Sequence, residues 1–213
     1  MTEADKALEA LNKAREDSDL DEIRAACRTL LETDAAPAIK HQAQYELGLC
    51  HLWRKENMEE AIALFSEVAK KPEKDDLSHT ARASLSICLW HTGQKSKAIF
   101  ELRKMIPKGC PPTMHTATAL DFLYLFLKDS SADPQSLKQT QVLRLTHLRH
   151  LQQEADNPES KAAWSMRLAV ALAEVGDGPS TQSAKKLCQE ILSQKAVLTD
   201  ELINQTQNLM KGL

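Results

Sequence analysis

Residues that favour strands and tight turns are scarce in this chain of 213 residues. Ile and Val together number 13 against 57 for Leu and Ala, and Gly and Pro together number only 14. Because β-branched side chains lose rotamer freedom in a helix while Leu and Ala lose little, this ratio favours helix. The glycines and prolines are too few for the turns of a β-sandwich or barrel. The composition predicts a soluble, all-α protein.

An excess of one charge and a long apolar run are also missing. The formal net charge is −3, with 17 basic and 19 acidic side chains in residues 1–110 and 10 and 11 in residues 111–213. Nucleic-acid binders usually carry a basic excess, because phosphate contacts supply most of their affinity. The longest apolar stretch, Leu120 to Leu127, contains Asp121 and is too short to span a bilayer. We therefore expect neither a nucleic-acid nor a membrane partner.

The cysteines do not form the pattern of a disulfide framework. They are five in number, widely dispersed and without a CxxC pair, at Cys27, Cys50, Cys88, Cys110 and Cys188. This pattern favours reduced thiols. The first residues, MTEADKALEALNK, contain no apolar core of a secretory signal and are too acidic for a transit peptide. We expect a cytoplasmic protein and leave the nucleus open.

Helical segments separated by short polar breaks follow one another along almost the whole chain. Breaks such as Asp17-Ser18-Asp19, the run Pro72 to Asp76 and Thr92-Gly93 supply helix caps and turns. The pattern predicts eleven helices and no strand, over residues 3–15, 20–33, 38–54, 58–70, 77–92, 95–106, 113–128, 135–155, 159–175, 181–194 and 199–211.

The second helices of successive pairs begin with comparable residues. Ile23 precedes Ala61 by 38 positions, and Ala61 precedes Ala98 by 37. The interval from Ala98 to Ala184 is 86, close to two further units with longer loops. A two-helix unit repeated four or five times predicts a solenoid.

The best-preserved repeats carry small residues where two helices cross and large residues beside them. Residues 41–72 contain Leu47-Gly48, then Glu60 to Phe65, then Pro72. Residues 79–107 carry the matching series Ala83, Ser86, Leu89, Gly93, Ala98, Leu102 and Met105. This order resembles the tetratricopeptide repeat (TPR) over about residues 41–107, and more loosely elsewhere. The resemblance implies a single TPR-like, right-handed α-solenoid domain over 1–213, with clear repeats in 1–110, divergent pairs in 111–198 and a C-terminal capping helix in 199–213.

The resemblance also implies a concave groove, lined by the first helix of each pair, that holds a peptide or partner helix. Carried over position by position, the groove-facing residues include Tyr45, Leu49, Leu52, Trp53, Ile87, Trp90 and His91, with Tyr124 at a similar place on the third such helix. Trp and Tyr are good interface anchors, because they bury much area with few rotatable bonds. The alternative is that these aromatic residues form the core between repeats.

Family members that grip the C-terminal carboxylate of heat-shock chaperones use Asn and Lys on these inner helices. The corresponding positions here hold Tyr45, Leu49 and Ala83, which offer neither an amide nor an ammonium donor. The sequence instead predicts an apolar, aromatic groove that suits a hydrophobic helix or strand.

Residues 134–153 contain no acidic side chain but form no continuous basic face, because Arg144 falls among leucines. We expect Arg144 to snorkel from a solvated helix. His147, His150 and Glu154 share a helix face, yet no further ligand for a metal is identified nearby. No catalytic motif is present, so we expect no enzyme, no cofactor and no metal.

The function predicted from these observations is non-catalytic protein–protein interaction. The chain would act as an adaptor or chaperone-like protein that binds an apolar or amphipathic segment of another protein. Two alternatives stay open: a scaffold subunit that uses its convex or C-terminal surfaces, and a nucleic-acid-binding helical repeat that uses residues 135–155. The sequence also leaves homo-oligomer formation open.

Overall fold

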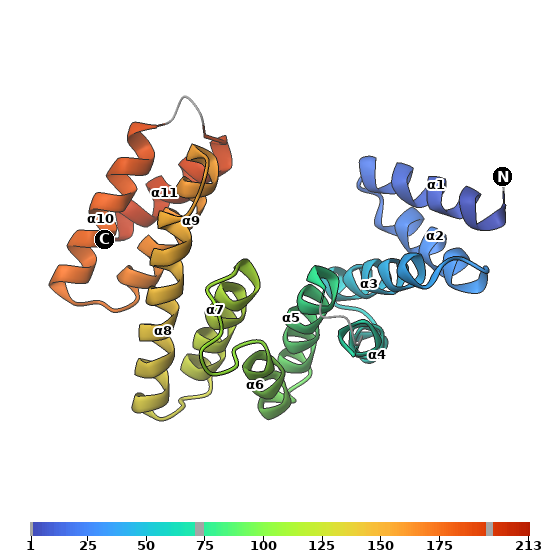
Figure 1. Cartoon of the computed structure of the whole chain (residues 1–213), viewed down its shortest axis with the longest axis horizontal. Coiled ribbons are helices and arrows are strands. Elements are labelled where there is room, and N and C mark those ends of the chain that lie inside the picture. Colours follow the sequence, from blue (N-terminus) through green and yellow to red (C-terminus); the bar gives the residue numbers. More distant parts are fainter. Residues whose placement is uncertain (1, 71–74, 195–197) are drawn as a thin grey trace. The chain divides into compact units, whose positions relative to one another are not determined.

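The computed structural model describes residues 2–70, 75–194 and 198–213 (Figure 1). Within these ranges the chain forms eleven α-helices and no strand, which confirms the predicted all-α class. The helices are α1 (Glu3–Glu16), α2 (Leu20–Glu32), α3 (Pro37–Arg54), α4 (Met58–Ala69), α5 (Asp76–His91), α6 (Lys95–Lys104), α7 (Met114–Asp129), α8 (Pro134–Gln153), α9 (Pro158–Ala173), α10 (Gly178–Ser193) and α11 (Asp200–Gly212). Pro72, which closes the best-preserved predicted repeat, and the neighbouring residues 71–74 lie outside the described residues.

Polar side chains set the helix starts at the places where the sequence predicts breaks. The Asp19 carboxylate accepts hydrogen bonds from the backbone N–H groups of Asp21 and Glu22 at the start of α2. Thr2 and Thr113 form capping boxes at α1 and α7. Such caps satisfy backbone donors that lack a partner within the helix. The helix boundaries therefore follow from local chemistry.

The chain divides into two units, Met1–Met105 and Ile106–Leu213. Unit 1 contains α1 to α6 and unit 2 contains α7 to α11, and within each unit every helix packs against the next one along the chain. This consecutive packing is the arrangement that stacked helical pairs produce. The division of 1–213 into clear repeats, divergent pairs and a capping helix stays a prediction.

In unit 1, the close crossing of α3 and α4 depends on the size of one residue. A Cβ atom added to Gly48 would lie 2.8 Å from Cε1 of Phe65, whose side chain is completely buried. In the next pair the corresponding residues are Ser86 and Leu102, both also completely buried. A larger residue on the first helix thus accompanies a smaller one on the second. This exchange keeps the repeat geometry while the side chains change.

In unit 2, an apolar core joins α7 to α11 and includes Ala117, Leu148, Ala169 and Cys188. The last helix, α11, contributes Leu209 and Met210 to this core. Its Thr206 is fully buried, and the Thr206 hydroxyl lies 3.6 Å from the Met166 sulfur of α9. These contacts dock α11 against the preceding pair.

Candidate partner-binding surface

The outward face of α3 in unit 1 carries one stripe of side chains, Gln42, Leu49 and Trp53, which are spaced for the same side of a helix. Leu49 is half-buried, whereas Trp53 is 60% exposed. An adjoining side of α3 is buried, with Ala43, Leu47 and Cys50 packed into the unit 1 core. Trp53 thus places a large aromatic side chain in solvent beside the buried face of α3.

The neighbouring first helix, α5, repeats the stripe 38 positions later as Thr80, Ile87 and His91. Ile87 is half-buried and His91 is exposed. Helices α3 and α5 contact each other directly, so the two stripes lie on adjacent elements of one unit. We call the surface formed by Gln42, Leu49, Trp53, Thr80, Ile87 and His91 the first-helix face.

The remaining predicted groove residues of unit 1 border this face and pack inward. The Tyr45 ring lies 5.7 Å from the buried Phe65 ring, measured between centroids. Burial raises the pKa of Tyr45, while a hydrogen bond between Tyr45 and Ser84 of α5 acts in the opposite direction. Tyr45 therefore contributes to the packing of α3, α4 and α5 and is only partly open to solvent. Leu52 is half-buried.

Trp90, also half-buried, lies at the end of α5 next to the start of α6. The Lys95 ammonium group is 4.6 Å from the Trp90 ring centroid. A cation at this distance is attracted to the negative face of the ring. Trp90 is therefore held by contacts within unit 1 and offers a partner only part of its surface.

Charged residues at the border of the first-helix face are paired within unit 1. The Glu46 carboxylate accepts hydrogen bonds from Arg15 of α1 at 2.9 Å and from Gln42 at 2.8 Å. Arg54, next to Trp53, pairs with Asp21 of α2 at 2.8 Å. These bonds fix α3 against α1 and α2. The exposed side chains of the first-helix face are therefore Trp53 and His91.

Tyr124, the last of the predicted groove residues, lies on α7 of unit 2. It is 5% exposed, and the Arg144 guanidinium of α8 lies 5.0 Å from its ring centroid. The Tyr124 ring is thus covered by the guanidinium group of Arg144. Partner binding by the eight predicted groove residues stays a prediction.

Arg144 differs from its predicted snorkelling position, because it is buried rather than directed to solvent. Its Nε atom donates to Asp121 of α7 at 2.5 Å, and its guanidinium also pairs with Glu174 of α9. Arg167 of α9 donates to the second Asp121 oxygen at 2.6 Å. We call Asp121, Arg144, Arg167 and Glu174 the unit 2 ion-pair cluster. The prediction failed because both acidic partners lie on other helices.

The cluster also bears on the nucleic-acid alternative. Arg144 is buried and paired with two carboxylates, so the exposed cationic side chains of α8 are Lys138 and Arg149, which lie eleven positions apart. His147 is buried, with its Nδ1 atom 3.1 Å from the Thr116 hydroxyl oxygen, while His150 is exposed. This arrangement does not form a basic stripe for phosphates.

The five cysteines are free thiols, and four of them are buried. Burial raises the pKa of Cys27 to about 12 and that of Cys88 to about 11. Because the thiolate is the nucleophilic form, these environments suppress thiol chemistry.

Among the described residues, no group of three or more His, Cys, Asp or Glu side chains is placed to hold a metal ion. Nor does any helix in residues 2–70, 75–194 and 198–213 combine the length and apolar character needed to cross a bilayer.

One exposed aromatic residue was missed in the sequence. Phe100 on α6, a second helix, is 59% exposed, almost the same fraction as Trp53. It stands at the rim of a cleft of about 360 Å³ whose apolar lining includes Ile62, Leu85 and Leu89. The signal was present, because Ala98 and Leu102 were predicted to be buried and the residue midway between them must point elsewhere.

No family model and no curated protein matches this sequence. Solved structures do match. A variant of a putative kinesin light chain from Podosopora anserina, described as having nearly identical TPR-like repeats, is 14% identical with a TM-score of 0.54, over 90% of this chain and 92% of that chain. BtubC (BKLC) from P. vanneervenii is 12% identical with a TM-score of 0.52, over 92% of this chain and 91% of that one. At such identities the likeness concerns the fold. The chain therefore has the TPR-like helical-repeat fold that its repeat spacing and small-residue pattern predict.

Proposed function

We propose that this chain is a non-catalytic protein-interaction module that holds an apolar or amphipathic segment of a partner on the first-helix face of unit 1. The exposure of Trp53 in the stripe with Leu49 carries this proposal. Tryptophan is enriched among the residues that dominate binding energy at interfaces. Roles as an adaptor and as a chaperone for one client both use this surface.

The neighbouring side chains suit an apolar segment better than a charged one. Leu49 and Ile87 offer apolar surface beside Trp53, while Arg15 and Arg54 are engaged with Glu46 and Asp21. A partner helix could bury its apolar side over the two adjacent stripes, because anchors at helical spacing match a row of such side chains. The dispersed cysteines favour the cytoplasm or nucleus as the compartment.

A scaffold function through the convex side is the second candidate. It is favoured by Phe100, which is exposed on α6 beside an apolar cleft. In helical-pair repeats the first helices line the concave side, so a second helix such as α6 contributes to the opposite side. Trp53 and Phe100 therefore form a matched pair, since both are exposed aromatic residues of unit 1 on helices of different type.

The experiment compares tagged full-length wild type with Trp53→Ala and Phe100→Ala in cells of the source organism. Captured proteins are quantified by mass spectrometry, and circular dichroism checks that each variant keeps its helix content. We expect Trp53→Ala to reduce the specific partner at least tenfold, as truncation of an aromatic anchor typically does, and Phe100→Ala to retain it. The reverse result would transfer the binding function to the convex side.

A further inference from the structure

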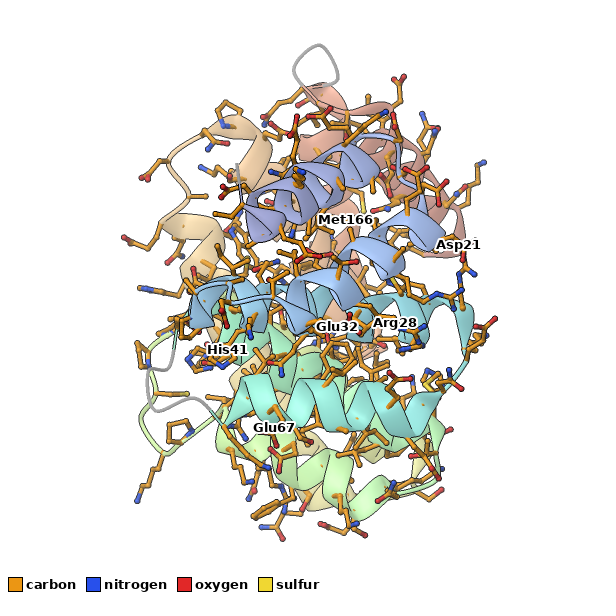
Figure 2. The ribbon with its side chains drawn as sticks, turned by 90° about the vertical axis from the view of Figure 1, so that its right-hand side faces the viewer. Asp21, Arg28, Glu32, His41, Glu67 and Met166 are labelled. Atoms are coloured by element: carbon orange, nitrogen blue, oxygen red, sulfur yellow. The ribbon has the colours of Figure 1, made fainter. Side chains whose placement is uncertain are left out.

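A second surface of unit 1 lies at α1 and α2, away from the first-helix face. The two helices run side by side and face the viewer in Figure 2, where Asp21 marks the beginning of α2 and Glu32 its end. A cleft of about 540 Å³ lies between them, and its apolar lining comes from four alanines, Ala7, Ala10, Ala25 and Ala26. Glu3, Lys6, Lys13 and Glu22 also line it. The cleft combines a shallow apolar floor with charged edges.

The repeat pattern indicates what normally covers such a cleft. Ala26 on α2 lies 38 positions before Leu64 on α4, the same interval that relates Ile23 to Ala61. Leu64 packs against the core cluster formed by α1, α2 and α3. In the second pair, the position equivalent to Ala26 is therefore covered by the preceding pair. In the first pair, the described residues that line the cleft belong to α1 and α2 alone. The cleft is therefore equivalent to a surface that, in the next pair, packs against another helical pair.

When two copies of α1 are placed antiparallel, charged side chains of one copy lie opposite side chains of the other sign on the second copy. Glu3, Lys6, Ala10 and Lys13 follow the alternating three- and four-residue spacing of one helix face. Antiparallel pairing centred near position 8 places Glu3 opposite Lys13 of the other copy, and Lys6 opposite its Ala10. Both Glu3–Lys13 pairs then form at once, because a two-fold axis repeats every contact.

We infer that two copies of this chain associate through the α1/α2 cleft, with the two α1 helices antiparallel. The alanines allow the helix axes to approach closely, and the stem of each Lys6 covers Ala10 of the other copy while its ammonium group reaches solvent. Among the described residues, Glu3, Lys6 and Lys13 form no ion pair within the chain, so their charged groups are available to the second copy. The contact is separate from the first-helix face and does not depend on the proposed function.

Sedimentation velocity of the full-length chain over a wide concentration range tests this inference. We expect a reversible dimer of twice the 23.8 kDa chain mass at high concentration. Ala10→Arg, at an exposed position of α1, should abolish the dimer at every concentration while the helix content is unchanged. Ala25→Arg on α2 provides a second block of the same cleft. Glu9→Arg is the control, because Glu9 is exposed on α1 outside the cleft lining.

A charge-exchange series tests the register. Glu3→Lys and Lys13→Glu should each weaken the dimer roughly tenfold, since each change converts two attractive pairs into repulsive ones. The variant with both changes should recover wild-type association. A monomer throughout, a dimer unaffected by Ala10→Arg and Ala25→Arg, or growth to open-ended oligomers would overturn the inference. Failure of the double exchange to recover would overturn the antiparallel pairing.

Discussion

Unit 1 and unit 2 hold similar helical pairs together by different means. In unit 1 the tightest crossing depends on shape, because Gly48 leaves the space that the buried Phe65 ring fills. In unit 2 three helices are joined by charge, since Arg144 of α8 is buried between Asp121 of α7 and Glu174 of α9. Shape matching between two helices leaves a repeated pattern of small and large residues in the sequence. An ion-pair cluster built from three helices leaves no such pattern. This difference accompanies a TPR resemblance that is good over about residues 41–107 and looser elsewhere.

The largest loss in the free energy of unfolding is expected from a substitution in unit 2. Arg144→Met removes the cation of a buried cluster and leaves the carboxylates of Asp121 and Glu174 with less compensation. Removal of one partner of a buried ion pair typically costs about 3–5 kcal/mol. We expect a corresponding drop in the free energy of unfolding, measured by urea denaturation followed by circular dichroism.

Arg149→Met is the control for that experiment, because Arg149 is exposed on the same helix. Its effect should stay within about 0.5 kcal/mol. Equal effects of the two substitutions would show that the cluster contributes no more to stability than a surface arginine. The two units would then not differ in the way described above.

A smaller effect is expected from disturbing the shape match in unit 1. Gly48→Ala places a methyl group against Phe65, and overpacking of a core typically costs about 1–3 kcal/mol. Replacing glycine by alanine in a helix returns about 1 kcal/mol of this, so we expect a net loss of up to about 2 kcal/mol in urea denaturation. Adding Phe65→Leu should recover part of the loss, because the next pair combines Ser86 with Leu102.

Gly178→Ala serves as the matched glycine control in unit 2. A Cβ atom at Gly178 would meet no heavy atom within 4 Å, and its φ is not in the left-handed region. The substitution should therefore be neutral or slightly stabilising. A loss at Gly178 as large as at Gly48 would argue against the role of the Phe65 contact.

The smallest effect concerns the acid sensitivity that His147 gives to unit 2. Burial, with a contribution from nearby His150, lowers the pKa of His147 below its ordinary value of 6.5. The folded state thus binds a proton less readily than the unfolded state. The contribution of His147 to the free energy of unfolding is therefore fully present above about pH 6.5. It declines as the pH falls through that value and levels off below the folded-state pKa. His147→Gln should make stability less dependent on pH between 7 and 5, as measured by thermal unfolding.

His150→Gln is the comparison for this prediction, because His150 is exposed on the same helix. It should leave most of the pH dependence in place. If His150→Gln flattened the profile as much as His147→Gln, the burial of His147 would not be the cause.

Much of the fold was predictable because its signals are local. Caps such as Asp19, the turn at Gly93 and the 38-residue interval from Ile23 to Ala61 depend on neighbouring residues or on a repeated pattern. The eleven helices of the described residues begin and end within three residues of the predicted bounds. The groove-facing position of Trp53 was implied by the TPR resemblance, and its side chain is 60% exposed.

The arrangement of unit 2 could not be predicted in the same way. Asp121, Arg144, Arg167 and Glu174 come together from three helices, with partners 23 to 46 positions apart. Within its own helix Arg144 has only leucines and polar neighbours on its face, so a snorkelling arginine was the natural expectation. Long-range pairing of charges leaves no periodic signal in the sequence.

The most direct test of the proposed protein-binding role is photo-crosslinking from two positions of unit 1. A benzophenone amino acid replaces Trp53 in one variant and Phe100 in the other, in full-length chains expressed in the source organism. We expect the probe on α3 to form a discrete crosslink to a partner protein, with the crosslinked peptide carrying apolar residues at helical spacing, and the probe on α6 to give none. Crosslinks from α6 alone, or from neither position, would contradict binding at the first-helix face.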